Sequence, residues 1–305
     1  MKYLSVIEIS KKWNISERSV RNYCNKGRVV GAILNGKTWL IPEDAVKPER
    51  QTRHLLKNYT LLDILKREKE SKLAGGIYHK LQIEMTYNSN HIEGSKLTHD
   101  QTRYIFETKT IAPEFDTVLV DDIIETTNHF RCIDLAIESA KTKLNESLIK
   151  QFHYILKNAT SDSLKPWFKV GDYKMVENEV AGIDTAKPNE VKEKIRELLS
   201  WYNSIKEVSI NDIIEFHYRF ECIHPFQDGN GRVGRLIMLK ECLKHNLVPI
   251  LITDEYKAFY YRGLKEWKYG KGYLLDTCLY GQDIFKKYLD YFNIKYWEWS
   301  TLKDE

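Results

Sequence analysis

Twelve consecutive residues, His224 to Arg235, combine side chains that suit the chemistry of a nucleotide polyphosphate. The stretch reads His-Pro-Phe-Gln-Asp-Gly-Asn-Gly-Arg-Val-Gly-Arg. The His224 imidazole has the ordinary pKa that best suits removal of a proton near neutral pH. The Asp228 carboxylate offers the oxygen ligands that Mg²⁺ prefers. These residue types predict a site where a base and a metal ion act on a phosphate group.

The glycines and arginines of the same stretch suit the anionic part of such a ligand. Gly229 and Gly231 allow the backbone to approach an anion closely. A helix beginning behind them would direct its free backbone N–H groups at a phosphate. Arg232 and Arg235 are three residues apart on one side of the first turn, and guanidinium forks match phosphate oxygens. The alternative is a glycine-rich turn that caps a buried helix, with solvated arginines.

Every fixed position of this stretch matches the signature of the Fic family, His-x-Phe-x-Asp/Glu-Gly-Asn-Gly-Arg-x-x-Arg. The resemblance implies transfer of AMP from ATP to a Ser, Thr or Tyr hydroxyl of a target protein, the chain itself included. It implies that His224 is the catalytic base and that Asp228 holds Mg²⁺. It also implies a set of nucleotide-binding residues: Gly229, Asn230, Gly231, Arg232, Arg235 and Tyr261.

A second short pattern lies upstream, at the end of a helix expected over about residues 80–94. Ser89, Glu93 and Gly94 follow Ser/Thr-x-x-x-Glu-Gly. Residues four apart share a helix face, and glycine suits the position after a helix end. Alone, the pattern is a helix end with a surface glutamate. Beside the signature it resembles the inhibitory helix of N-terminally inhibited Fic proteins, which implies that Glu93 pairs with Arg235 and that ATP then binds unproductively.

The stretch between Lys174 and Pro188 predicts a β-hairpin, because apolar residues including Val176 and Val180 alternate with polar ones. The Fic family has its flap at this position, which aligns a target segment through strand-like backbone contacts. The family residue after the tyrosine is typically arginine, and here it is Lys174. The alternative is an ordinary surface hairpin.

Composition indicates a soluble globular protein, with 42% hydrophobic and 30% charged residues among 305. No apolar run is long enough to span a bilayer, and the N-terminus lacks the apolar core of a signal peptide. The five cysteines are scattered and form no Cys-x-x-Cys pair. These features predict reduced thiols in the cytoplasm and no membrane partner.

The N-terminal region is basic, with 12 Lys and Arg against 5 Asp and Glu in residues 1–58. A capping box predicts a helix from Ser5 to Trp13, and a second helix should run from Glu17 to about Asn25. Alternation around Asn-Gly predicts a hairpin over Val29 to Ile41, and Pro42 is expected to start a third short helix.

Helix, turn, helix and hairpin resemble the winged helix-turn-helix of MerR and excisionase-type proteins. The resemblance implies that residues 1–50 bind DNA, with the second helix in the major groove. Arg18, Arg21 and Lys26 are the candidate DNA-binding residues of that helix and its end. The alternative is a basic docking module that never meets DNA.

The expected fold is mostly α, a helical Fic core with a β-hairpin flap behind a small winged helix-turn-helix domain. Residues 1–50 form the first domain, residues 51–75 a linker and a solvated helix, and residues 76–305 the Fic domain with its C-terminal helices. Two other functions stay open: a hydrolase that removes AMP from a modified protein, and a DNA-binding regulator with a nucleotide-sensing Fic domain. Family members often self-associate, so a homo-oligomer is also open.

Overall fold

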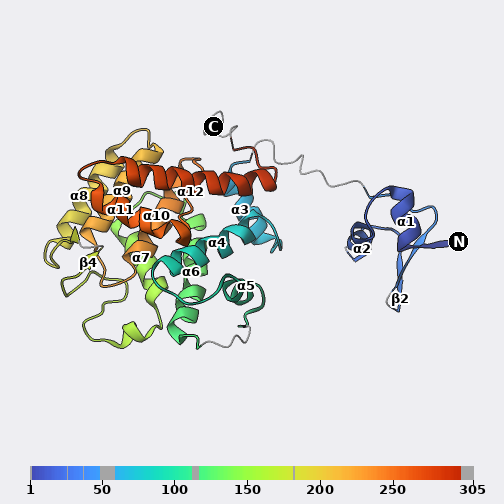
Figure 1. Cartoon of the computed structure of the whole chain (residues 1–305), viewed down its shortest axis with the longest axis horizontal. Coiled ribbons are helices and arrows are strands. Elements are labelled where there is room, and N and C mark those ends of the chain that lie inside the picture. Colours follow the sequence, from blue (N-terminus) through green and yellow to red (C-terminus); the bar gives the residue numbers. More distant parts are fainter. Residues whose placement is uncertain are drawn as a thin grey trace. The chain divides into compact units, whose positions relative to one another are not determined.

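The computed structural model describes residues 2–25, 27–36, 38–48, 59–111, 117–180 and 183–296, with the backbone alone for 179, 180, 183 and 184. The chain divides into two compact units, Met1–Lys57 and Asn58–Glu305 (Figure 1). The first unit mixes helices with a small sheet, and the second is built almost wholly from helices.

Two helices and one three-stranded antiparallel sheet form the first unit, with strand order β1-β3-β2. The capping box is present, because the Glu8 backbone N–H donates to Ser5 Oγ and the Ser5 backbone N–H donates back to Glu8. The helix predicted at Pro42 is wrong: Pro42 ends a strand and a turn follows, since pairing with β1 keeps this segment extended. The elements are β1 (Tyr3–Ser5), α1 (Val6–Trp13), α2 (Glu17–Asn25), β2 (Ile33–Asn35) and β3 (Thr38–Pro42).

One apolar cluster holds these elements together. The buried side chains come from both helices, from the segment before β2 and from β3: Val6, Ile9, Trp13, Val20, Cys24, Val29 and Ile41. Their spacing along each helix places them on one face, which leaves the charged side chains of α2 facing solvent.

A long succession of helices forms the second unit. In order they are α3 (Leu61–Glu70), α4 (Ile77–Ile92), α5 (His99–Thr108), α6 (Val120–Glu138), α7 (Glu146–Lys157), α8 (Val191–Ser204), α9 (Ile210–Ile223), α10 (Asn230–Lys244), α11 (Lys257–Glu266) and α12 (Gly272–Tyr291). Two short 3-10 helices, η2 (Ser161–Leu164) and η3 (Asp254–Tyr256), and the antiparallel pair β4 (Glu179–Val180) and β5 (Ile183–Asp184) complete it.

Helix α10 is the centre of the second unit (Figure 1). Every residue from Asn230 to Leu243 is buried, and the helix packs against α3, α4, α6, α7 and α9. A helix that is enclosed on all sides has no amphipathic stripe. The surrounding helices therefore fix the position of α10, at whose N-terminus the glycine-rich stretch lies.

The solvated helix predicted within residues 51–75 is wrong in its exposure. Helix α3 has the expected bounds, but Leu61, Leu62, Ile64 and Leu65 are buried, and the helix packs against α4 and α6. The cause is the spacing of those four residues, which places them on one helix face, and of the charged residues of α3 only Glu68 is buried.

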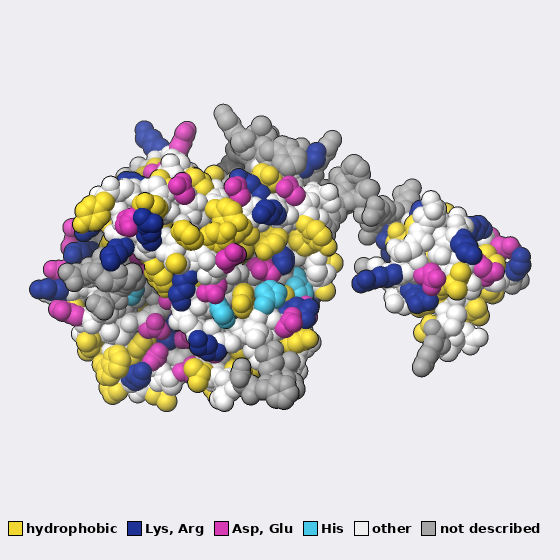
Figure 2. All heavy atoms as spheres, viewed as in Figure 1, with side chains coloured by type: hydrophobic (Ala, Val, Ile, Leu, Met, Phe, Trp, Pro, Cys, Tyr) yellow, Lys and Arg dark blue, Asp and Glu magenta, His cyan; other side chains and the backbone are white. Residues whose placement is uncertain are grey.

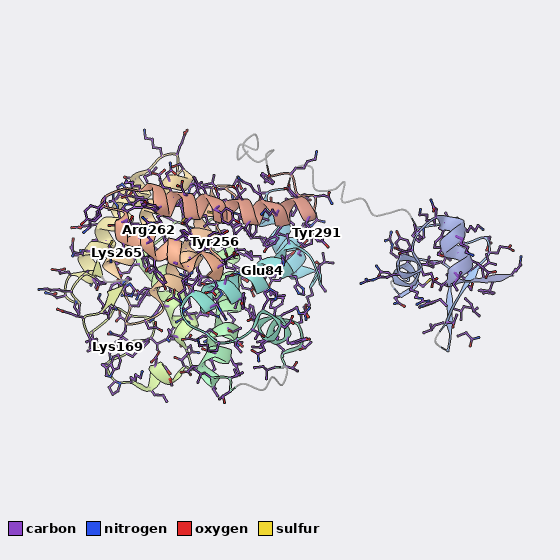
Figure 3. The ribbon with its side chains drawn as sticks, viewed as in Figure 1. Glu84, Lys169, Tyr256, Arg262, Lys265 and Tyr291 are labelled. Atoms are coloured by element: carbon purple, nitrogen blue, oxygen red, sulfur yellow. The ribbon has the colours of Figure 1, made fainter. Side chains whose placement is uncertain are left out.

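The surface of the second unit carries mixed charge. Figure 2 shows positive and negative side chains intermingled over the visible face, and Figure 3 shows Arg262 and Lys265 of α11 on the exterior, where both are exposed. Among the described residues, no helix is both long enough and apolar enough to cross a lipid bilayer.

Candidate active site

Six residues, 224–229, connect α9 to α10 and form the loop predicted to bind a nucleotide. The loop bends sharply at both ends, because His224 (φ 49°) and Gly229 (φ 80°) adopt left-handed backbone conformations. The Asn230 side chain braces it: the Phe226 N–H donates to Asn230 Oδ1 at 2.8 Å, and Asn230 Nδ2 donates to the Phe226 carbonyl at 2.8 Å. Asn230 is 1% exposed, so its side chain builds the loop rather than facing a ligand.

The predicted base, His224, lies at the end of α9 and is largely buried. Burial, followed by the nearby Lys174 ammonium, lowers the pKa of His224 to about 4. The imidazole is therefore neutral near pH 7 and can accept a proton. The carboxylate nearest to it belongs to Glu221, with Oε2 3.7 Å from His224 Nδ1. Burial raises the pKa of Glu221 to about 8.

Arg235 contacts the end of α4, where the resemblance placed its partner Glu93. Its Nη2 donates to Glu93 Oε1 at 2.7 Å and to the Ser89 carbonyl at 3.0 Å, and its Nε donates to Ser89 Oγ at 2.9 Å. A Cβ at position 231 would lie 2.3 Å from Glu93 Oε1. A side chain at position 231 would therefore displace the Glu93 carboxylate from its present place beside the arginine. Gly94 follows with φ 102°, a conformation that glycine tolerates.

Arg232 lies in a separate charged cluster. It donates to Glu125 and, through Nη2, to Asp228 Oδ2 at 3.1 Å. The Lys157 ammonium donates to Glu125 at 2.5 Å, to Asp162 at 2.7 Å and to Asp228 Oδ2 at 2.7 Å. These five side chains bring together α6, α7, η2, the loop and α10.

Three members of this cluster, Glu125, Lys157 and Asp162, do not follow from the motif. One signal for Lys157 exists in the sequence. Residues 149, 153 and 157 are four apart on α7, and Ile149 and His153 are buried, so the lysine continues a buried face. Nothing comparable marks Glu125 or Asp162.

The residues present fit a Mg²⁺ ion that is shared with a phosphate. Burial alone would raise the pKa of Asp228, but Arg232 and Lys157 hold it well below its usual range, so the group is a carboxylate. Its side chain is 48% exposed, and only Oδ2 has contacts to Lys157 and Arg232. Mg²⁺ is often bound by one or two carboxylates together with substrate phosphates, and Asp228 offers such a ligand.

The predicted flap is tied to the loop by Lys174. The Lys174 N–H donates to the Pro225 carbonyl at 2.8 Å, and Nζ donates to Asn178 Oδ1 at 2.6 Å and to Thr185 Oγ1 at 2.8 Å. Lysine at this position therefore braces the base of the hairpin against the His224 loop. Burial lowers the pKa of this lysine to about 8.

The hairpin itself is shorter than predicted. Its strands are Glu179–Val180 and Ile183–Asp184. Val176 precedes them, is 49% exposed, and donates its N–H to Gln227 Oε1 at 3.2 Å. Val180 pairs with Ile183. Pairing starts late because Lys174 and Asn178 first hold the chain against the loop.

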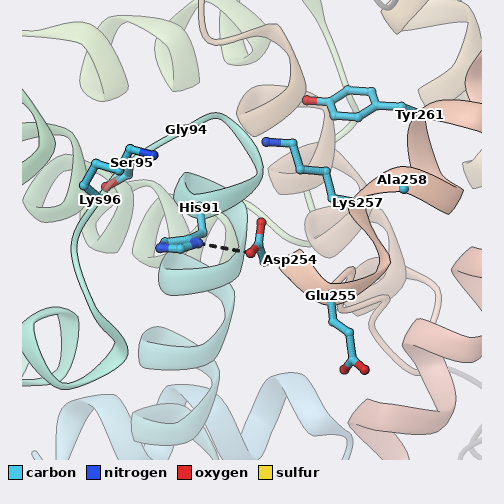
Figure 4. Close-up of a pocket in the computed structure, with 9 residues that line it drawn as sticks. All are labelled: His91, Gly94, Ser95, Lys96, Asp254, Glu255, Lys257, Ala258 and Tyr261. Carbon is cyan, nitrogen blue, oxygen red and sulfur yellow. Dashed lines mark hydrogen bonds and ion pairs between the residues drawn. The ribbon is translucent and has the colours of Figure 1, made fainter.

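Tyr261 belongs to α11, and its side chain contacts the end of α4, where its hydroxyl donates to the Ile92 carbonyl at 3.4 Å. It also borders an open hollow of about 590 Å³ between the α4 end and the η3–α11 segment (Figure 4). Within the hollow, His91 Nδ1 and Asp254 Oδ2 are 3.1 Å apart. Tyr260 instead belongs to the core, 1% exposed and bonded to His217.

Two of the three candidate DNA-binding residues can be located. Arg18 and Arg21 are exposed on α2, and Arg21 pairs with Glu17 at 3.1 Å. Lys26 lies outside the described residues.

Comparison with known proteins finds similarity in both sequence and fold. Residues 143–242 match the family model described as the Fic/DOC family. Among solved structures, a Fic domain containing signaling protein from Bacteroides thetaiotaomicron is similar with a TM-score of 0.61 and 23% identity, over 80% of this chain and 98% of that one. A Fic family protein from Desulfovibrio desulfuricans gives 0.57 and 21%, over 77% of this chain and 76% of that one.

Curated relatives carry the name protein adenylyltransferase. The chain is 26% identical over 217 residues to protein adenylyltransferase Fic of Nematostella vectensis, which covers 67% of this chain and 49% of the relative. It is 25% identical over 187 residues to protein adenylyltransferase fic-1 of Caenorhabditis elegans, covering 58% and 35%. The chain thus spans less than half the length of these homologues.

Proposed function

We propose that the chain is a protein adenylyltransferase that Glu93 holds in an inhibited state. The single observation that carries this proposal is the contact of Glu93 with Arg235 at the start of α10, beside a complete Fic loop. Homology to protein adenylyltransferases supports the reaction type.

The base acts first in the proposed reaction. Neutral His224 removes the proton from a Ser, Thr or Tyr hydroxyl of the target protein. The hydroxyl oxygen bonds to the α-phosphorus of ATP, and the bond from that phosphorus to the β-phosphate bridging oxygen breaks. AMP stays on the target and pyrophosphate leaves. Removal of a proton by a positioned histidine contributes about 10²–10⁴ in rate.

The start of α10 supplies the phosphate site. Backbone N–H groups at the N-terminus of a helix attract anions, and Gly229 and Gly231 leave room above them. Mg²⁺ bound at Asp228 would neutralise phosphate charge. Among the described residues, Arg232 Nε and Arg235 Nη1 are buried donors without a hydrogen-bond partner, and unpaired buried donors of this kind favour an anionic ligand.

Inhibition follows from competition between two anions for one arginine. The Glu93 carboxylate holds Arg235, which would otherwise receive the terminal phosphate of ATP. A guanidinium fork binds carboxylates and phosphates in the same geometry. While Glu93 is in place, the triphosphate cannot extend fully, and the α-phosphorus is not aligned with the attacking hydroxyl.

The test uses α-labelled ATP, Mg²⁺ and a cell lysate containing target proteins. Glu93→Gly should label protein strongly, and wild type and Glu93→Gly/His224→Ala only weakly. Glu138→Gly is the matched control, because Glu138 also ends a helix and also forms a salt bridge, with Lys69. If Glu93→Gly labels no more than Glu93→Gly/His224→Ala, the transferase proposal fails.

A second candidate is the reverse chemistry, removal of AMP by water. The observation that favours it is that Glu93 Oε1 lies directly over Gly231, where a carboxylate could orient water. An AMP-modified substrate protein tests it: hydrolysis that is lost in Glu93→Gln favours this candidate, and hydrolysis that persists excludes a role for Glu93.

We also infer that the first unit binds duplex DNA as a winged helix-turn-helix. Support comes from the exposed Arg18 and Arg21 of α2 and from the excess of basic residues. Binding to labelled duplex should weaken in Arg18→Ala/Arg21→Ala and fall steeply as salt rises. Unchanged binding in that variant would contradict the assignment of α2. DNA binding without any nucleotide transfer would favour a regulator that senses nucleotide.

A further inference from the structure

Lys157 is a buried cation that the proposed reaction does not use. It is the last residue of α7, and its side chain is 2% exposed. An ammonium group has three N–H donors, and here three carboxylates accept them: Glu125, Asp162 and Asp228. Burying a charge is costly unless it is paired and hydrogen-bonded, so this arrangement satisfies the lysine completely.

The same three carboxylates resemble the ligand set of a metal ion. One oxygen from each lies within 4.8 Å of the others, and Glu125, Asp162 and Asp228 come from three separate segments of the chain. Oxygen ligands from carboxylates are those that Mg²⁺ and Mn²⁺ prefer. The Lys157 ammonium occupies the centre of the group, the position that a metal ion would take.

Charge explains how this cluster differs from a preformed metal site. Three carboxylates face two buried cations, Lys157 and Arg232, and Asp162 also pairs with the exposed Lys165, so their negative charge is already balanced. Asp228 is the most exposed of the three carboxylates, at 48% against 13% for Glu125 and 22% for Asp162. The carboxylate that is most open to solvent is therefore the one on the loop.

We propose that Lys157 is a positioning residue that acts as a built-in cation. It holds Oδ2 of Asp228 and keeps divalent metal out of the three-carboxylate group. Metal then binds at the exposed side of Asp228, together with nucleotide phosphates. The last step rests on the proposed function, whereas exclusion of metal from the group does not.

The test is a titration of the full chain with Mn²⁺ in the absence of nucleotide, with free Mn²⁺ measured by electron paramagnetic resonance. Wild type should bind Mn²⁺ weakly. Lys157→Met should bind one Mn²⁺ per chain at least about 10-fold more tightly, because three carboxylates then lack their central cation. Lys165→Met is the matched control: Lys165 pairs with Asp162 at 2.6 Å but is 45% exposed, and its loss should leave Mn²⁺ binding at the wild-type level.

Thermal unfolding gives a second readout that a purely structural lysine would not produce. Mn²⁺ should raise the Tm of Lys157→Met and leave that of wild type almost unchanged. If Lys157→Met does not fold, Lys157→Gln is measured in the same way, since it removes the charge but keeps a donor. Tight binding of Mn²⁺ by wild type without nucleotide overturns the proposal. So does a folded neutral variant that binds Mn²⁺ no better than wild type.

Both measurements omit ATP, so their outcome is independent of catalysis. Mn²⁺ binding as expected, without any AMP transfer in Glu93→Gly, would retain the role of Lys157 in metal exclusion and reject the transferase. AMP transfer in Glu93→Gly, together with Mn²⁺ binding in Lys157→Met that does not differ from wild type, would retain the transferase and reject the role of Lys157.

Discussion

The two arginines of the Fic signature lie three residues apart on one helix, yet their surroundings differ. Both are 3% exposed and both pair with carboxylates. Arg232 shares Glu125 and Asp228 with Lys157, inside a cluster of five charged groups. Arg235 has Glu93 as its carboxylate partner and completes its contacts with Ser89.

Because of this difference, we expect the Arg232 cluster to stabilise the fold and the contact of Arg235 with Glu93 to control activity. Taking Glu125 out of the Arg232 cluster leaves two buried cations, Lys157 and Arg232, short of a partner, which is strongly destabilising. Withdrawal of Glu93 leaves Arg235 bonded to Ser89, with a vacant place that a phosphate can fill. We therefore expect changes on the Arg232 side to reduce stability, and changes on the Arg235 side to alter activity.

The largest expected effect follows from loss of the catalytic base, His224. In a Glu93→Gly background, His224→Ala should lower the rate of AMP transfer by about 10²–10⁴. Nucleotide affinity should change little, because neither arginine is touched. Initial rates and equilibrium binding of an ATP analogue separate these effects. A His224→Ala variant that retains the full rate would remove the histidine from the mechanism.

The next largest effect is a loss of stability when the Arg232 cluster loses a carboxylate. Glu125→Gln should lower the free energy of unfolding by about 3–5 kcal/mol, since it takes a carboxylate from Arg232 and from Lys157 at once. Glu93→Gln should cost much less, because Glu93 contacts one cation and is 23% exposed. Urea unfolding of both variants checks the contrast. Equal losses would show that the two arginines are held alike.

Gly231→Ala sharpens the comparison by a double-mutant cycle. The new methyl group would lie 2.3 Å from Glu93 Oε1, so overpacking should cost about 1–3 kcal/mol in the wild-type background. In the Glu93→Gly background the cost should be smaller, because the Glu93 carboxylate is gone and only Arg235 Nη1, at 3.0 Å, stays close to the methyl group. Thermal or urea unfolding of the four proteins measures this coupling. A cost that is the same in both backgrounds would mean that Glu93 does not occupy this place in solution.

The smallest effect concerns pH. The pKa of His224 lies at about 4, below its ordinary value, and the base works only when neutral. The rate of Glu93→Gly should therefore change by less than about two-fold between pH 6 and 8 through His224, with its acid limb far below the ordinary histidine range. Glu93 acts to raise this pKa, so its removal moves the limb lower still. A rate that halves near pH 6.5 would contradict the burial of His224.

Titration of His224 also has a sign for stability. A histidine whose pKa is depressed by folding binds its proton more readily in the unfolded chain. The stability that the folded chain has while His224 is neutral in both states is therefore lost as the pH falls from about 6.5, the ordinary pKa of histidine, towards about 4, the pKa of His224 in the folded chain.

Local signals in the sequence predicted much of this structure. The capping residue Ser5 begins a helix where expected, because a cap is decided by residues three or four positions apart. The pairing of Glu93 with Arg235 was predictable only through resemblance to a family, since 142 residues separate them.

Features that depend on tertiary packing escaped prediction. The buried face of α3 is surrounded by charged residues in the sequence, and Pro42 offered a helix start that pairing with β1 overrides. The Lys157 cluster draws its carboxylates from three segments, so no spacing within one segment reveals it. Asn230 carries a motif position, yet its side chain holds the Phe226 backbone.

The most direct test of the central claim is the intact mass of the purified chain after incubation with ATP and Mg²⁺, wild type beside Glu93→Gly and Glu93→Gly/His224→Ala. The chain's own hydroxyl groups serve as the acceptors. We expect Glu93→Gly to gain the mass of one or more AMP groups, and both wild type and the double variant to gain almost none. An unmodified Glu93→Gly, under conditions where it binds ATP, or modification that persists without His224, would contradict the account of a histidine base restrained by a glutamate.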